Sequence, residues 1–127
     1  MIEISAAPET VCYCHCVDCR RITGAPVAAF ACFPAESVRV RPEPGRRSAF
    51  DGVRRRTCPA CGSPLTAEFD YLPGQIYVPV GVIDDASDLA PEMHAHANRC
   101  LPWLKIEDDL PRQEGTARDV LNVASRA

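Results

Sequence analysis

Apolar residues recur along the chain in short runs of strand length, separated by prolines, glycines and charged residues. Residues 10–16 are rich in β-branched and aromatic side chains, residues 27–33 are mostly apolar, and residues 37–41 alternate valines with charged neighbours. Residues 65–69 and 75–82 continue the pattern. Runs of this length and period are typical of strands rather than helices. The pattern therefore predicts a mostly β fold with little helix.

The segments between these runs predict turns, one long loop and one short helix. Residues 20–26 and residues 70–74 are predicted turns, the latter joining two strands as a hairpin. Residues 42–56 form a predicted loop rich in Pro, Gly and Arg, and the chain from Thr116 onward could form a short helix. Residues 2–5 resemble the end of a strand. At 127 residues and with no internal repeat, the chain is predicted to form a single domain over residues 1–127.

Charge and hydropathy narrow the classes of partner. The net charge is −3, and aromatic residues make up only 6% of the chain, so a nucleic-acid binder is disfavoured. The longest mostly apolar run, residues 25–35, is too short to cross a bilayer, and residues 1–8 show no secretory signal. We therefore expect a cytoplasmic protein that binds neither nucleic acid nor membrane.

Eight cysteines are many for a chain of this length, and in a reducing compartment disulfides do not explain them. Cys58 and Cys61 are three residues apart, a spacing at which two thiolates can wrap one metal ion in a tight turn. Gly62 follows at a position that needs positive φ, which glycine adopts without steric cost. This motif predicts half of a zinc site.

A second group of cysteines lies in residues 12–19. Side chains alternate faces in an extended segment, so Cys12, Cys14 and Cys16 share a face and His15 points away, which makes His15 a poor ligand for the same ion. Cys16 and Cys19 repeat the metal-binding spacing. Thiolates of both groups together suit tetrahedral zinc, so Zn²⁺ is the predicted cofactor. Cys12 lies on the ligand face but outside the tightest spacing.

The remaining cysteines and the nearest arginines have less specific roles. Cys32 and Cys100 stand alone in apolar surroundings and are predicted to pack as small hydrophobic residues. Arg20 and Arg21 could offset the negative charge of a zinc–thiolate site, bind the carboxylates of an acidic thiol substrate, or be solvated.

Four stretches of the chain resemble the glutathione-dependent formaldehyde-activating (GFA) family, which is related to the CENP-V domain. They occur in the family's order and span nearly the whole chain. They are residues 14–25 (CHCVDCRRITGA), 58–65 (CPACGSPL), 80–85 (VGVIDD) and 101–104 (LPWL).

The resemblance implies a tent-like fold of antiparallel β-sheets stapled by zinc. It also implies a carbon–sulfur lyase activity, the condensation of glutathione with formaldehyde to S-(hydroxymethyl)glutathione, so the expected partners are a small thiol and an aldehyde. In the family pattern Cys14, Cys16 and Cys19 match the ligands of the catalytic zinc. Cys58 and Cys61 match half of a structural zinc site.

The sequence departs from the family at its start. The other half of the structural site normally comes from a Cys-x-Cys motif in a first strand, whereas residues 1–5 resemble the strand that follows it. We therefore expect a shortened amino terminus. Our hypothesis at this level is one zinc shared between Cys14–Cys19 and the Cys58/Cys61 pair, which could close the open position that catalysis requires.

Two functions follow from these expectations. In the first, Cys14, Cys16 and Cys19 hold zinc with one position free, a thiol substrate is activated there, and Arg20 or Arg21 anchors substrate carboxylates. The side chains that could then transfer protons are Asp84, Asp85, His94 and His96. Turn or surface roles are the more common ones for residues of these types. In the second, zinc only stabilises a binding module. A homodimer is compatible with either.

Overall fold

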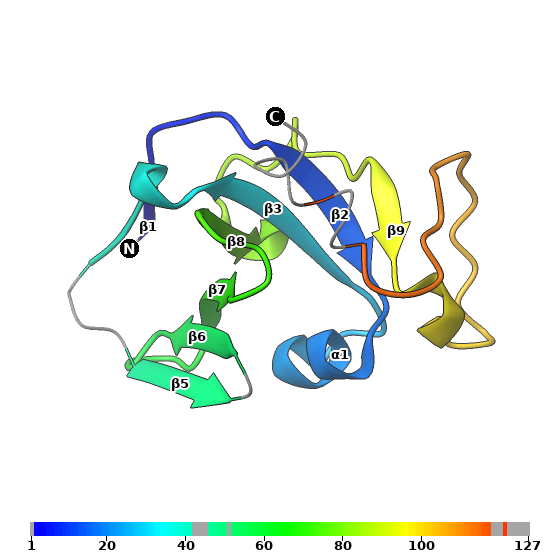
Figure 1. The fold of residues 1–127 in the computed structure, drawn as a ribbon, viewed down its shortest axis with the longest axis horizontal. Coiled ribbons are helices and arrows are strands. Elements are labelled where there is room, and N and C mark those ends of the chain that lie inside the picture. The colour runs from blue at the N-terminus through cyan, green and yellow to red at the C-terminus, as the bar shows by residue number, and fades with distance from the viewer. Residues whose placement is uncertain (1, 42–45, 51, 118–120, 122–127) are drawn as a thin grey trace.

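The computed structural model describes residues 2–41, 46–50, 52–117 and 121 (Figure 1). Its strands and helices, in chain order, are β1 (Ile2–Ile4), β2 (Thr10–Cys14), α1 (Val17–Thr23), β3 (Ala28–Pro34), η1 (Ala35–Ser37), β4 (Val38–Val40), β5 (Arg46–Phe50), β6 (Val53–Thr57), β7 (Pro64–Phe69), β8 (Gln75–Pro79), η2 (Val80–Val82), β9 (Met93–Ala95) and η3 (Ala97–Arg99). The η elements are single 3₁₀ turns.

The strands form two sheets. Strands β1 and β4 pair with each other, and the remaining seven form one sheet in the order β5-β6-β7-β8-β3-β2-β9. Its pairs are antiparallel except β2 with β9, which run parallel with Cys14 opposite Ala95. The β5–β6 hairpin and α1 both lie below the long strands β2 and β3 in Figure 1. This bent sheet confirms the predicted mostly β, tent-like fold.

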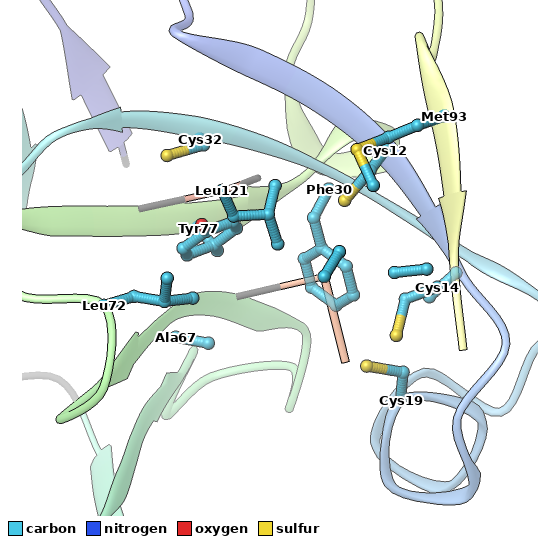
Figure 2. Packing of buried hydrophobic residues seen from close by; sticks show 13 residues of the cluster. Cys12, Cys14, Cys19, Phe30, Cys32, Ala67, Leu72, Tyr77, Met93 and Leu121 are labelled. Atoms are coloured by element: carbon cyan, nitrogen blue, oxygen red, sulfur yellow. The ribbon is translucent and has the colours of Figure 1, made fainter. Parts of the chain in front are cut away.

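Strand β3 is buried on both faces, which explains why its sequence is apolar rather than alternating. Phe30 and Cys32 point into a cluster that also contains Tyr77 and Leu121, as Figure 2 shows. Ala31 and Phe33 point into a second cluster with Val11 and Val78. The first cluster also contains Cys14 and Cys19, so the core continues directly into the cysteine group.

Most predicted strands are present, and the differences have local causes. The predicted loop over residues 42–56 contains the hairpin of β5 and β6, because the arginine-rich sequence of these strands does not indicate a hairpin. The predicted turn over residues 20–26 begins inside α1, which covers residues 17–23. Residues 80–82, predicted as the end of a strand, form a 3₁₀ turn after β8. The predicted turn over residues 70–74 joins β7 to β8, with Gly74 at φ 78°.

The predicted helix after Thr116 falls largely outside the described residues. Within them, the Leu121 amide donates to the Ala117 carbonyl at 2.8 Å, the spacing of one helical turn. None of the described helices has the length and apolar character needed to pass through a bilayer.

Candidate metal centre

Three thiols meet where β2 ends and α1 begins. Cys14 is the last residue of β2, Cys16 caps the helix, and Cys19 lies in the first turn of α1. The Sγ atoms of Cys14 and Cys16 are 3.4 Å apart. Figure 2 shows the Cys14 and Cys19 side chains pointing toward each other from strand and helix. The sequence-predicted group Cys14, Cys16 and Cys19 is thus brought together by the fold.

The local sequence explains this geometry. Cys16 has extended backbone angles (φ −64°, ψ 157°), and its sulfur accepts the Cys19 backbone N–H at 3.2 Å, as an N-cap side chain does. The helix ends at Gly24, whose positive φ of 69° lets its N–H donate to the Arg20 carbonyl. The metal-binding spacing of Cys16 and Cys19 therefore corresponds to the N-cap and the first turn of a short helix.

His96 completes the group from a distant part of the chain. Because β9 runs parallel to β2 with Ala95 opposite Cys14, the residue that follows β9, His96, reaches the same end of the sheet. His96 has a positive φ of 51°, and its N–H donates to the Gly115 carbonyl at 2.9 Å. The metal-binding atoms of Cys14, Cys16 and His96 all lie within 4.8 Å of one another. The sequence pointed to His96 for proton transfer but gave no sign of this proximity.

The contacts among the thiols favour one thiolate. Hydrogen bonds from Cys14 and Cys19 lower the pKa of Cys16 to about 2. The bond to Cys16 and burial raise the pKa of Cys14 to about 12, and the pKa of Cys19 is also raised, first by its bonds to Cys14 and Cys16. Three adjacent negative charges would repel one another, so full deprotonation of the cluster needs a cation.

The donor set fits zinc. Tetrahedral zinc with Zn–S distances of about 2.3 Å places its sulfur ligands about 3.8 Å apart, close to the observed approach of Cys14 and Cys16. Thiolate and imidazole are the ligands that zinc prefers in proteins. Cys14 and Cys16 would hold the ion, His96 lies within reach of both, and the Cys19 thiol, which contacts both sulfurs, is the other candidate donor.

The thiol group lies in the wall of a cavity of about 190 Å³. The opposite walls are mostly apolar and aromatic and come from β3, β6, β7, β8 and the loops after them. The lining residues include Phe30, Val53, Arg55, Phe69, Tyr71, Leu72, Tyr77, Thr116 and Leu121. Cys12 also lines it, and burial raises the pKa of the Cys12 thiol to about 12. A small molecule in this cavity would therefore touch the thiols directly.

Other predicted site residues lie elsewhere. Arg20 and Arg21 are not among the residues that line the cavity, and their contact with substrate stays a prediction. Asp84 and Asp85 are exposed and line a separate hollow with Ile2 and Ile4. Arg55 takes the place in the cavity wall that the sequence assigned to Arg20 or Arg21.

Cys58 and Cys61 lie apart from this cluster. They follow β6, whose direction in Figure 1 leads away from α1, and neither belongs to the metal-binding group of the described residues. Gly62 has the predicted positive φ, 78°, and its N–H donates to the Cys58 carbonyl at 2.8 Å. The local turn is as predicted, but the structure does not bring the two segments together, as one shared zinc would require. Metal binding by Cys58 and Cys61 stays a prediction.

The separation of the two groups makes the metal at the cluster independent of Cys58 and Cys61. We expect the double variant Cys58→Ser/Cys61→Ser to keep a tightly bound zinc ion whose affinity is unchanged within about twofold, because neither cysteine belongs to the metal-binding group of the described residues and independent sites act additively. Chelator competition on purified protein measures the affinity. Loss of all zinc from the double variant would instead support the hypothesis of one zinc ion shared between the two cysteine groups.

Behind the cluster, a buried polar chain joins β2 to β9. His15 Nε2 lies 2.8 Å from His94 Nδ1, and His94 Nε2 lies 2.9 Å from Asp108 Oδ2. Arg112 donates to the other Asp108 oxygen at 2.9 Å, and Tyr13 stacks on the His94 ring at 4.8 Å. As predicted, His15 faces away from the thiols. His94 is here a buried structural side chain, only 1% exposed.

The buried imidazole of His15 makes stability depend on pH. Burial and the nearby His94 lower the pKa of His15, and its Nδ1 has no partner in the described part of the chain. The unfolded chain therefore binds a proton near pH 6.5, while the folded protein does not. We expect the metal-free protein to lose stability as the pH falls below about 6.5, measured by urea unfolding. His15→Gln should flatten this dependence, and an unchanged slope would contradict the assignment.

Known proteins were compared with the chain and its fold. The sequence model of the glutathione-dependent formaldehyde-activating enzymes matches residues 1–99. A crystal structure of a Rhodobacter sphaeroides protein, solved in a structural genomics programme, matches with a TM-score of 0.50 and 21% sequence identity, covering 88% of this chain and 90% of that one. No curated protein sequence matches significantly. Because the family match spans most of the sequence, the chain belongs to the glutathione-dependent formaldehyde-activating enzyme family.

Proposed function

We propose that the protein is a zinc-dependent carbon–sulfur lyase-type enzyme that adds a small thiol, such as glutathione, to formaldehyde or a related small aldehyde. Family membership supports this reaction class. The observation that carries the proposal is the position of the thiol group in the wall of a cavity. A zinc site that served folding alone would need no such access.

The reaction forms one bond and moves one proton. The thiol sulfur bonds to the carbonyl carbon, the π electrons of the carbonyl pass to its oxygen, and the thiol proton ends on that oxygen. Zinc, when bound, supplies a Lewis acid that lowers the pKa of a coordinated thiol. Cys14, Cys16 and Cys19 would provide the thiolates that hold this cation, and the apolar walls would exclude water from the reacting groups. His96, which also lines the cavity, would accept the thiol proton.

The experiment measures both binding and turnover. Cobalt-substituted protein is titrated with glutathione, and the thiolate-to-cobalt absorption is recorded. Exchange between free formaldehyde and its glutathione adduct is then followed by NMR, with zinc-loaded and metal-free protein compared. We expect glutathione or another small thiol to change the cobalt spectrum, and zinc-loaded protein to accelerate exchange. A spectrum that no thiol changes, or equal exchange rates with and without zinc, would overturn the proposal.

A second candidate is a non-catalytic zinc-stabilised module. The observation in its favour is that His96 lies close to Cys14 and Cys16, so that these three residues together with Cys19 could fill all four positions of tetrahedral zinc. In that case His96→Ala should open a position and make the cobalt spectrum of the variant respond to thiols, whereas the spectrum of the unmodified protein should not respond.

A further inference from the structure

Arg55 is the cation of the cavity wall. It lies on β6, where side chains alternate faces, so Val53 and Arg55 line the cavity while Arg54 points to the other side of the strand. The Arg55 guanidinium carbon lies 5.9 Å from the centre of the Phe69 ring, a cation–π contact that fixes its position. Phe69 is itself held edge-on against Tyr77, with ring centres 5.5 Å apart.

Arg55 has no carboxylate partner among the described residues. Its neighbour Arg54 pairs with Asp70 and Glu68, and Arg112 pairs with Asp108. Asp18, the other charged residue of the lining, is exposed, and no ion pair joins it to Arg55. Arg55 is half-buried beside aromatic rings and pairs with no carboxylate of the described residues, so its guanidinium is suited to bind a carboxylate through two parallel hydrogen bonds.

The rest of the lining indicates what joins this carboxylate to the thiol. The cavity that Arg55 and the cysteines line is also lined by Phe30, Phe69 and Tyr77, and its volume is about 190 Å³. Such walls favour an apolar spacer over a polar one, because burying an unpaired amide or hydroxyl is costly. The volume suits a compact molecule.

We propose that Arg55 binds the carboxylate of the substrate, so that the preferred substrate is a compact thiol acid with an apolar spacer between its sulfur and its carboxylate. This inference rests on the proposed function, since it assumes that a thiol binds at the cysteine group. It assigns to β6 the anchoring role that the sequence suggested for Arg20 and Arg21.

The test compares ω-mercaptocarboxylic acids with ω-mercaptoalcohols of the same chain length. Each is titrated into cobalt-substituted protein, and the spectrum gives the dissociation constant. A charge-assisted hydrogen-bond pair should make the acids bind roughly tenfold to hundredfold more tightly than the alcohols, with an optimum chain length that matches the span of the cavity.

Variants separate the role of Arg55 from general charge. Arg55→Gln should remove the preference for acids. Arg55→Lys should keep part of it, because lysine retains the positive charge but lacks the planar group that donates two parallel hydrogen bonds. Arg54→Gln is the matched control, one residue away on the opposite face, and should leave the preference unchanged. Metal content and thermal unfolding of each variant show that it is folded.

The outcomes distinguish this inference from the proposed function. If no thiol changes the cobalt spectrum, the proposed function fails and this inference with it. If thiols bind but acids and alcohols bind equally, or if Arg55→Gln keeps the preference, the inference alone is overturned.

Discussion

Cys16→Ser is expected to lose the bound zinc and, with it, any zinc-dependent activity. Cys16 supplies the thiolate at the centre of the group, within 3.4 Å of the Cys14 sulfur. Structural zinc sites bind with about 10–16 kcal/mol over four ligands, so the loss of one ligand should weaken affinity roughly a hundredfold to a thousandfold. Chelator competition and a zinc count after gel filtration measure the loss.

The choice of serine keeps the fold intact. Cys16 is the N-cap of α1, where its sulfur accepts the Cys19 N–H, and serine is among the best residues for this position. The control is Cys100→Ser, because the Cys100 sulfur donates to the Leu101 and Leu104 carbonyls and Cys100 is not in the metal-binding group of the described residues, so that this substitution should leave zinc affinity unchanged. A Cys16→Ser protein that retains zinc at the original affinity would show that the metal, if bound, is held elsewhere.

Local features of the fold could be predicted because short stretches of sequence determine them. The apolar run at residues 27–33 became β3, and the Cys58-to-Gly62 turn has its glycine at positive φ. The spacing of Cys14, Cys16 and Cys19 sufficed to predict that these thiols meet. These predictions needed no knowledge of which strands pair.

Features that depend on long-range pairing could not be predicted. His96 reaches the thiols because β9 pairs in parallel with β2, which lies about eighty residues earlier, and no local pattern marks a three-residue strand. Arg55 lies in the cavity because an arginine-rich hairpin, predicted as a loop, forms the end of the sheet. The burial of side chains in this hairpin arises from its place in the sheet and not from the strand propensity of its own residues.

The distance between the two cysteine groups has the same origin. Spacing in sequence predicts which ligands can share a turn, but it does not determine which turns meet. Here β6 leads away from α1 toward its carboxyl end, whereas Val53 and Arg55, among its first three residues, line the cavity. One strand therefore separates the two groups that the sequence placed together.

His94→Leu is expected to destabilise the metal-free protein by about 3 kcal/mol, because it removes the middle of a buried polar chain. His94 is 1% exposed, and its loss leaves the buried His15 Nε2 without its hydrogen-bond partner. It also removes the ring on which Tyr13 stacks. Urea unfolding should show a lower midpoint with an unchanged slope, as expected for a loss of stability alone.

The double variant His15→Leu/His94→Leu tests whether the contact itself causes this loss. The double variant leaves no histidine nitrogen without its partner, and the loss of the His94 contact with Asp108 is common to His94→Leu and the double variant, so the double variant should be less destabilised than the sum of the two single variants. The hydrogen-bonded histidines also connect the end of β2, which carries Cys14, to β9, which leads to His96. We therefore expect His94→Leu to weaken zinc binding about tenfold as well, as loss of a supporting contact behind a metal site does. Additive stability losses together with unchanged zinc affinity would show that the two histidines do not support the metal centre.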